Sequence, residues 1–491
     1  MVSSHLSIEG LLRQLNQLAR TAPRDLHVPI EAEDVQGLVF RGYGGLKHAS
    51  YPLLRIKDGA AADARAWLRA LEPRIARGRQ ESRDVAIQIA FTYPGLAQLR
   101  LAPELLAGFS REFREGMTTD HRRRLLGDDD ATNHPDYWRW GGPKNAAVHI
   151  ALVLLARSAD RLSQLHGELA AAWTAAGLEE VSLLETSELR DTEHFGFVDG
   201  ISQPAIEGYH QSSSPLHKLK AGEFLLGYPN EYGLFTDRPM AGPSLDPRGI
   251  LPLDSEQSPR RDFGKNGTYL VFRQVRQNVP AFRNTLDELT RNPNGTPNRE
   301  ARDRLAAQMV GRWPSGASLV LSPERDDVTQ AKANEFRYHA EDRLGLKCPI
   351  GSHVRRANPR DALDPLPGTE TSLAVNRHHR LIRRGRAYGP PLPEGAVDDA
   401  DRGLILIFVN AMIARQFEFV QHSWINDPHF NGLHNDSDPI VGSSTKNEFA
   451  APGEPIGRRC TGLPRFVTVT GGGYFFLPGI RALRYLAEVT P

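Results

Sequence analysis

The chain has 491 residues, which is long for one hydrophobic core, so we expect two domains or one large duplicated unit. Its 60 basic and 59 acidic side chains leave a net charge of +1, which argues against a nucleic-acid partner. Two cysteines, Cys348 and Cys460, are too few for a disulfide scaffold or a cysteine-rich metal site, and they favour a reducing compartment.

Residues 1–34 are predicted to form an N-terminal helix and a linker. Apolar residues recur at helical spacing from Ile8 to Leu18, and Pro23 and Pro29 follow them. The segment lacks the basic stretch and apolar run of a secretion signal, and no window reaches the ~18 apolar residues of a membrane helix. We therefore expect a cytoplasmic protein without a membrane partner.

Residues 35–205 are predicted to form a first α+β domain. Strands alternate with amphipathic helices, which indicates an antiparallel sheet with helices on one face. The expected elements are two strands around a glycine-rich turn at 35–57, a helix at 60–71, strands at 85–93 and 148–154, and a helix at 158–172. The polar and aromatic stretch 122–143 is predicted to be a surface excursion.

Residues 266–491 are predicted to form a second domain that repeats this pattern, after a long excursion at 206–265 that is rich in Pro, Gly and Ser. A strand and helix at 268–289 match the pair at 51–71. A strand and helix at 403–424 match the pair that begins at 148. A cleft between two like domains is a natural place for a ligand.

The segment 194–204, His-Phe-Gly-Phe-Val-Asp-Gly-Ile-Ser-Gln-Pro, contains a lone acid between two glycines. Gly196 and Gly200 indicate that the backbone bends sharply around Asp199 or lets another group approach it closely. Either Asp199 is a turn residue, since Asp-Gly is a common turn signal, or it is a functional carboxylate.

His353 follows a turn of small residues and precedes two arginines, Arg355 and Arg356. Neighbouring arginines disfavour a cationic imidazole, so a neutral His353 could bind a metal. The arginines would suit an anionic group of the same ligand, such as a carboxylate. The alternative is a solvated basic turn with an incidental histidine.

A second basic stretch, 377–389, alternates apolar and basic side chains. On a strand, one of the neighbouring arginines Arg383 and Arg384 would point inward and the other would lie in water, and the buried one would need an anion such as Asp199. The alternative is a basic edge strand that protects a sheet edge. The adjacent His378 and His379 would point to opposite faces of a strand and could not share a metal.

Glu418 lies between Phe417 and Phe419, which predicts a partly buried carboxylate that needs a partner. The N–H of a metal-bound imidazole would serve, and Asp427 is the rival acceptor. The alternative is an ion pair with Arg415, three residues earlier. The chain has no Walker loop, dinucleotide fingerprint, His-Glu-x-x-His or Gly-x-Ser-x-Gly, which disfavours nucleotide, zinc-protease and serine-hydrolase functions.

Four stretches together resemble the dye-decolourising peroxidase family of haem enzymes, and the helix around Glu418 is most similar to the family's longer bacterial members. They are Gly196-Phe-Val-Asp-Gly200, Cys348-Pro-Ile-Gly-Ser-His-Val-Arg-Arg, Leu381-Ile-Arg-Arg-Gly-Arg-Ala-Tyr-Gly389 and Thr470-Gly-Gly-Gly-Tyr-Phe-Phe-Leu-Pro478. They span most of the chain in the family's order. The resemblance implies an α+β fold of two ferredoxin-like domains, with haem b in the cleft between them or within the second.

By this resemblance, His353 is the proximal iron ligand, Asp199 the distal acid and Arg383 the distal arginine, with Arg384 as the fallback. Glu418 would accept the N–H of the ligating imidazole, with Asp427 as the alternative. The remaining implied cofactor contacts are Arg355, Arg356, Gln203, Leu404 and Leu406. The chain departs from many members at Arg386-Ala387, where they have an apolar residue and proline.

The implied function is a peroxidase with one haem b per chain. Hydrogen peroxide would oxidise dyes, phenols or other organic reductants through a ferryl intermediate. The alternative is a haem-binding or haem-transfer protein with little turnover. Bulky dyes would deliver electrons through surface Trp or Tyr residues such as Trp424, Tyr388 or Tyr474. A homo-oligomer is left open.

Overall fold

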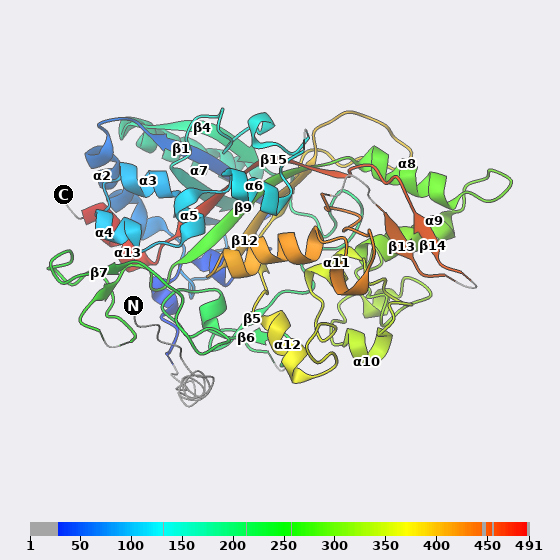
Figure 1. The fold of residues 1–491 in the computed structure, drawn as a ribbon. Helices are drawn as coiled ribbons and strands as arrows, with labels where there is room; N and C mark the ends of the chain where they lie inside the picture. The colour runs from blue at the N-terminus through cyan, green and yellow to red at the C-terminus, as the bar shows by residue number, and fades with distance from the viewer. Residues whose placement is uncertain are drawn as a thin grey trace, which may run out of the picture.

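A computed structural model describes residues 28–130, 132–212, 214–256, 258–443, 448–453 and 456–488 (Figure 1). The predicted N-terminal helix around Ile8–Leu18 lies outside these residues. Among the described residues, no helix combines the length and apolar character needed to cross a membrane.

Two groups of strands form one antiparallel sheet, which has nine strands within the described residues (Figure 1). The first group pairs in the order β2-β3-β1-β4 and the second in the order β10-β12-β9-β15, with β11 beside β12. Numbered along the chain, both groups follow the order 2-3-1-4 of a ferredoxin-like unit. The predicted duplicated α+β fold is therefore confirmed, and the two units share one sheet through the pair Phe476–Phe91.

The strands of this sheet are β1 (His48–Ile56), β2 (Val85–Phe91), β3 (Ile150–Ala156), β4 (Leu178–Glu185), β9 (Thr268–Gln277), β10 (Ile382–Arg383), β11 (Arg386–Tyr388), β12 (Gly403–Asn410) and β15 (Val467–Leu477). Small two-stranded sheets pair β5 (Ala205–Ile206) with β6 (Lys218–Leu219), β7 (Met240–Ala241) with β8 (Arg261–Asp262), and β13 (Phe449–Ala451) with β14 (Arg458–Cys460).

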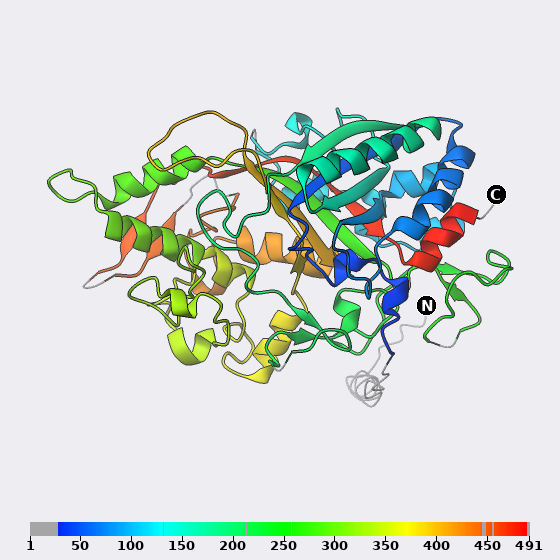
Figure 2. The same cartoon turned by 180° about the vertical axis from the view of Figure 1, so that it is seen from behind.

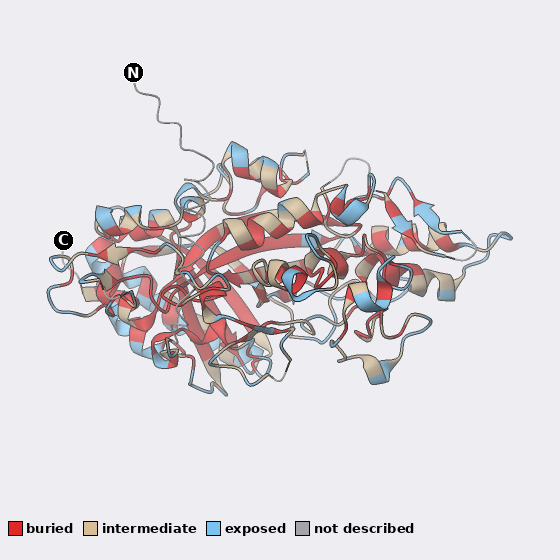
Figure 3. Cartoon of the chain, turned by 60° about the horizontal axis from the view of Figure 1, so that its bottom comes forward, coloured by how far each residue is buried: buried red, intermediate tan, exposed pale blue. Residues whose placement is uncertain are grey.

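Helices cover one face of the sheet. Successive side chains of a strand point to opposite faces, so each strand contributes side chains to two layers of the core. On β1, Leu54 and Ile56 face the helical layer, whereas Tyr51 and Leu53 face the other layer. Figure 3 shows the strands as a buried centre between these layers. The longer helices of the described chain are α2 (Ala61–Leu71), α7 (Ala159–Ala175), α8 (Val279–Thr290), α9 (Arg299–Val310) and α13 (Ile480–Glu488).

The shorter helices lie in connections. They are α3 (Tyr93–Gln98), α4 (Pro103–Ala107), α5 (Arg111–Glu115), α6 (Asp120–Leu126), α10 (Tyr338–Asp342), α11 (His353–Ala357) and α12 (Glu370–Arg377). The predicted helix at 413–424 consists of two π-helical segments, η7 (Ala414–Glu418) and η8 (Val420–Ile425). Segments from the two ends of the chain meet where α13 packs beside α2, and Arg69 donates to the Ala487 carbonyl at 2.8 Å (Figure 2).

The prediction of a strand before the glycine-rich turn was wrong. Residues 32–39 form two 3₁₀ turns, η1 (Ala32–Asp34) and η2 (Gly37–Val39). Gln36 explains the difference, because its side-chain amide donates to the carbonyls of Ile89 and Pro478 and accepts the Ile89 N–H. It thus bonds the seam where β2 and β15 meet, which a strand at this position could not do.

The surface excursion predicted at 122–143 was wrong for its two tryptophans, although Tyr137 is 69% exposed as expected. Trp138 and Trp140 are only 4% and 2% exposed, and the Trp140 indole N–H donates to Gln274 on β9. The stretch 206–265 likewise contributes to the core through Phe224, Leu225 and Tyr228. The predicted domain boundaries at 34/35, 205/206 and 265/266 stay predictions.

Candidate active site

A cavity of about 310 Å³ lies against the second half of the sheet. Strand β12 presents Leu404, Leu406 and Phe408 to it, because the alternate residues Ile405 and Ile407 are buried in the opposite face at 1% exposure. The other walls come from β9, β15, α11, η8 and the loop 193–202. Predicted residues Leu404 and Leu406 therefore line a largely apolar chamber.

His353 begins α11 and projects into this cavity. Its Nδ1 lies 2.8 Å from Oδ2 of Asp438, whose side chain is fully buried. An ionised carboxylate only accepts, so Nδ1 carries the hydrogen and Nε2 is left as a lone-pair donor. Burial tends to lower the pKa of His353, but the charge and the hydrogen bond of Asp438, together with the charge of Asp199, raise the pKa overall.

Asp438 is itself held in place by backbone groups. Its Oδ1 accepts the N–H groups of Ile440 and Val441, both at 2.9 Å. Burial tends to raise the pKa of Asp438, yet His353 and these N–H groups lower it, so the carboxylate stays ionised. An imidazole fixed in this way is a typical metal ligand.

The prediction that Glu418 or Asp427 accepts this N–H was wrong. Glu418 instead accepts from Tyr474 at 2.7 Å and from Arg122 at 2.9 Å, in a buried network outside the cavity lining. The Asp427 carboxylate caps the backbone of His429. Asp438 was missed because it lies 85 residues from His353 in sequence, in a loop with no motif to mark it.

Arg355 and Arg356 do not line the cavity, so their prediction as cofactor contacts was wrong. Arg355 pairs with Asp342 at 3.0 Å, and Arg356 donates to backbone carbonyls, including that of Trp424 at 2.7 Å. The two guanidiniums are buried in the structure that supports α11. The argument that they keep His353 neutral fails, because Asp438 determines its protonation instead.

Asp199 and Arg383, which lie far apart in sequence, form an ion pair in the cavity wall, with Arg383 Nη2 3.1 Å from Oδ1 of Asp199. The same oxygen accepts the Gly200 N–H at 2.6 Å. Burial tends to raise the pKa of Asp199, but the charge of Arg383 and the Gly200 N–H lower it overall. The Asp199 side chain remains 63% exposed towards the cavity.

Backbone geometry positions this pair. Gly196 and Gly200 have φ values of 101° and 86°, which only glycine adopts without strain, so the flanking glycines are required as the sequence indicated. Gln203 lies outside the lining, and its side chain bonds both the N–H and the carbonyl of Arg383. Arg384, the fallback, donates instead to the carbonyls of Leu38 and Val39.

Two further acidic groups line the cavity and were not singled out from the sequence. Glu193 accepts the Gln277 side-chain amide at 2.6 Å and two backbone N–H groups, and burial raises its pKa. Asp128 forms a two-point ion pair with Arg273 at 2.6 and 2.7 Å. The spacing of residues in the sequence does not mark Glu193 or Asp128 as cavity residues, because the position of each depends on contacts between distant elements.

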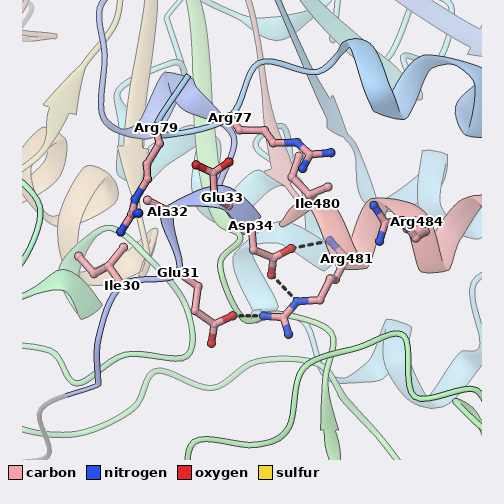
Figure 4. A pocket seen from close by; sticks show the side chains of 10 residues that line it. All are labelled: Ile30, Glu31, Ala32, Glu33, Asp34, Arg77, Arg79, Ile480, Arg481 and Arg484. Carbon is pink, nitrogen blue, oxygen red and sulfur yellow. Dashed lines mark hydrogen bonds and ion pairs between the residues drawn. The ribbon is translucent and has the colours of Figure 1, made fainter. Parts of the chain in front are cut away.

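A second hollow lies between residues 30–34 and α13 (Figure 4). It contains none of the residues described above. Arg481 bonds Glu31 and Asp34, and Lys265 pairs with Glu31 at 2.7 Å, so two cations balance the two carboxylates and Arg481 ties the start of the described chain to its last helix. The candidate catalytic residues therefore lie in the cavity at His353 and not in this hollow.

Comparison with known proteins agrees with this geometry. No family model matches the chain. A dye-decolorizing peroxidase (msp1) of the fungus Mycetinis scorodonius is 28% identical over 439 residues, which is 82% of this chain and 77% of that protein. The multifunctional dye peroxidase DyP2 of the bacterium Amycolatopsis is 28% identical over 379 residues, 72% of this chain and 74% of that protein.

Solved structures give the same result. An ancestral D-type dye-decolorizing peroxidase superposes with a TM-score of 0.74 at 26% identity, over 93% of this chain and 99% of that one. A dye-decolorizing peroxidase in complex with 2,6-dimethoxyphenol gives a TM-score of 0.74 at 25% identity, over 94% of this chain and all of that one. In sequence and in fold the chain is similar to the dye-decolourising peroxidases. It is a peroxidase, an oxidoreductase that acts on peroxide, and the family's enzymes use haem.

The residues of this cavity fit a haem. One histidine offers Nε2 to the cavity with Nδ1 already engaged, and the walls beside it are apolar. The equal 28% identities to a fungal and a bacterial enzyme do not test the closer similarity to bacterial members.

The three suggested surface relays are all buried. Trp424, Tyr388 and Tyr474 are 4%, 6% and 3% exposed, so none of them can meet a bulky dye directly. The sequence could not show this, because aromatic residues occupy cores and surfaces alike.

Proposed function

We propose that the cavity binds one haem b per chain and that His353 supplies the protein ligand to its iron through Nε2. The support is the hydrogen bond from His353 Nδ1 to Asp438, which leaves a single, oriented donor facing a cavity with apolar walls. Asp438 would make the imidazole a stronger electron donor. When bound, the haem supplies the redox chemistry that converts peroxide into oxidising equivalents.

Asp199 and Arg383 act on the peroxide itself. The Asp199 carboxylate takes the proton from one peroxide oxygen and delivers it to the other, so that the second oxygen leaves as water. Arg383 stabilises the negative charge that develops on the leaving oxygen as the O–O bond breaks. Both groups line one cavity and lie 3.1 Å apart, which is the observation that carries this assignment.

For the organic reductant we propose phenols and synthetic dyes, because related enzymes are named for dyes and one was solved with 2,6-dimethoxyphenol. A small phenol could enter the cavity or donate at its mouth. Dyes too large to enter would donate electrons at the surface.

The test compares haem-loaded wild type with Asp199→Asn and Arg383→Leu by stopped-flow absorbance after one equivalent of peroxide. Each variant should retain the haem spectrum yet react roughly 10² to 10⁴ times more slowly. The surface pair Asp84–Arg161, 2.8 Å apart, provides the control, since Asp84→Asn should react at the wild-type rate. Wild-type rates in both cavity variants would refute the assignment.

A haem carrier without turnover is the runner-up, and steady-state oxidation of 2,6-dimethoxyphenol separates it from a peroxidase. Rapid peroxide-dependent turnover supports the enzyme. Haem release to an acceptor protein without turnover supports the carrier. The Asp199–Arg383 pair favours the enzyme, because carriage alone has no use for a charged pair that faces the cavity.

We also propose a cytoplasmic location, supported by two buried free thiols, Cys348 and Cys460. Cell fractionation with an antibody to the chain tests this location, and recovery with secreted proteins would contradict it.

A further inference from the structure

Glu193 lines the same cavity as Asp199 but has no role in the reaction described above. Its carboxylate accepts three hydrogen bonds. Oε2 accepts the Phe195 N–H at 2.9 Å and the Gln277 side-chain amide at 2.6 Å, and Oε1 accepts the Phe197 N–H at 3.0 Å. Two of these donors belong to the loop that carries Asp199, and the third belongs to β9. The Glu193 side chain therefore fastens this loop to the sheet.

The loop folds back on itself around this carboxylate. The Glu193 N–H donates to the Phe197 carbonyl at 3.0 Å, and the Gly196 N–H donates to the Glu193 carbonyl at 3.0 Å. Gly196, at a φ of 101°, makes the turn between the two arms. Asp199 comes two residues after Phe197, so the position of the second arm determines the position of the Asp199 carboxylate.

The other end of the same segment is fastened to the strand that carries Arg383. Gln203 accepts the Arg383 N–H through Oε1 at 3.0 Å and donates from Nε2 to the Arg383 carbonyl at 3.3 Å. Arg383 lies on β10, whereas Gln277 lies on β9. The segment around Asp199 is thus tied to one strand before the acid and to another strand after it.

The Asp199 carboxylate has few contacts of its own. Within the part of the chain that the structure describes, it bonds only the N–H of its neighbour Gly200 and the Arg383 guanidinium. The Asp199 side chain is 63% exposed and the Arg383 side chain is 34% exposed, so packing does not hold the pair together. The ties at Glu193 and Gln203 are therefore needed to fix its geometry.

We propose that Glu193 and Gln203 are positioning residues that together hold the Asp199 carboxylate within reach of both Arg383 and the peroxide. This inference rests on the proposed function, since it takes Asp199 as the proton-transfer group. A displacement of about 1 Å in a reacting group can slow a reaction about 100-fold. Loss of either tie should therefore slow the reaction with peroxide, although neither side chain takes part in the proton transfer.

The first test measures the reaction of the haem-loaded variants with peroxide by stopped-flow absorbance. Glu193→Ala and Gln203→Ala should each react about 10 to 100 times more slowly than wild type. Glu193→Gln should lose less, because its amide oxygen can still accept one backbone N–H. Wild-type rates in both alanine variants would overturn the proposal.

A double-mutant cycle separates positioning from an independent catalytic role of Glu193. Adding Glu193→Ala to Asp199→Asn should slow the reaction by less than about twofold, because the asparagine cannot take the proton wherever it lies. If Glu193→Ala caused its full loss in the Asp199→Asn background as well, Glu193 would act without Asp199 and the inference would be wrong.

Hydrogen–deuterium exchange of the haem-free full-length chain gives a readout that does not depend on turnover. Peptides that contain Phe195 and Phe197 should exchange faster in Glu193→Ala, because both N–H groups lose their acceptor, whereas peptides of β12 should be unchanged. Unchanged exchange at 193–199 would show that the carboxylate does not hold the loop, and would also overturn the proposal.

Glu418→Gln is the matched control, because Glu418 is a buried, hydrogen-bonded carboxylate outside the cavity lining. It should lower the melting temperature and leave the rate with peroxide unchanged, which separates lost stability from lost positioning. If Asp199→Asn itself reacted at the wild-type rate, the proposed function would fail. If Asp199→Asn reacted slowly while Glu193→Ala and Gln203→Ala reacted normally, only the present inference would fail.

Discussion

The ionisation of Asp199 depends mainly on one neighbour. Arg383 lies 3.1 Å away and holds the carboxylate's pKa below its ordinary value, against the opposing effect of burial. The proposed proton transfer needs the ionised form to accept the first proton. Activity should therefore persist into acidic solution and fall only as pH drops through this lowered pKa.

Replacing Arg383 should raise the pKa of Asp199, because the strongest effect that opposes burial is lost and only the Gly200 N–H and the charge of His353 still lower the pKa. We expect the acidic limb of the pH profile of kcat/KM for peroxide to move to higher pH in Arg383→Leu. Arg383→Lys should move it less, since it keeps a positive charge. An acidic limb that stays at the wild-type pH in both variants would show that Arg383 does not control this titration.

Asp438 should determine how firmly haem iron is held. Asp438→Asn removes the charge that polarises His353 and should weaken haem retention about 10- to 100-fold. It should also raise the iron's reduction potential, because a less basic imidazole donates less electron density. Haem transfer to apomyoglobin and spectroelectrochemical titration measure the two effects.

Two controls for Asp438 come from the sequence predictions that failed. Asp427→Asn and Glu418→Gln should leave the reduction potential at the wild-type value, since neither carboxylate reaches His353. A shift in either variant as large as that of Asp438→Asn would contradict the assigned hydrogen bond.

The limits of sequence reasoning are clear at this scale. Local patterns made His353, Asp199 and Arg383 candidates, the family resemblance assigned their roles, and the structure places all three in one cavity. Glu418 was correctly expected to be buried, since aromatic residues flank it, but its partner proved to be Arg122, 296 residues away. The local sequence indicates which side chains are buried and which can react. It does not indicate which side chains, hundreds of residues apart, form hydrogen bonds or ion pairs, because those contacts depend on the completed fold.

Alternate side chains of strand β12 have different roles: one set lines the cavity and the other set packs in the core on the opposite face. Leu406 faces the cavity and Ile407 faces the opposite core, where it is 1% exposed. Ile407→Ala should cost about 2–5 kcal/mol in unfolding free energy with an unchanged Soret band. Leu406→Ala should cost less stability but should shift the Soret band, because it alters the haem wall.

Denaturant unfolding and absorption spectra of these two variants give the comparison. If both variants lost the same stability and showed the same spectrum, the two faces of β12 would not be divided as the structure indicates. The strand itself was predicted from the run Gly-Leu-Ile-Leu-Ile-Phe-Val-Asn. An unbroken apolar run does not say which face carries the ligand, so Leu404 and Leu406 were named only through the family resemblance.

Elements without strong periodicity were harder to predict. The run Val35-Gln-Gly-Leu-Val-Phe suggested a strand, yet Gln36 bonds backbone groups at the seam of the sheet and the segment turns as a 3₁₀ helix. The helix expected at 413–424 exists but is π-helical, which changes which side chains share a face. Tertiary contacts decide both cases.

At the scale of the whole molecule, the two ferredoxin-like halves are joined by a common hydrophobic core and not merely by a connecting segment. Phe476 of β15 pairs with Phe91 of β2 and packs against Phe109 and Phe263, so the seam is an aromatic cluster. One hydrophobic cluster contains residues of both halves, from Leu54 to Ala487. The duplication was visible in sequence order, whereas the shared sheet was not, because strand pairing between halves leaves no local pattern.

This shared core predicts one cooperative unfolding transition, even though the chain is long enough for two domains. In calorimetry, the haem-free chain should give a single endotherm, and haem should raise its midpoint as a unit because it binds only the folded state. Phe476→Ala should cost about 3–5 kcal/mol and lower the midpoint while leaving one transition. Two endotherms, with haem moving only one of them, would mean that the halves fold independently and that the seam contributes little. The surface variant Asp84→Asn should closely reproduce the wild-type trace, because the Asp84 side chain is about half exposed and its ion pairs with Arg157 and Arg161 contribute little.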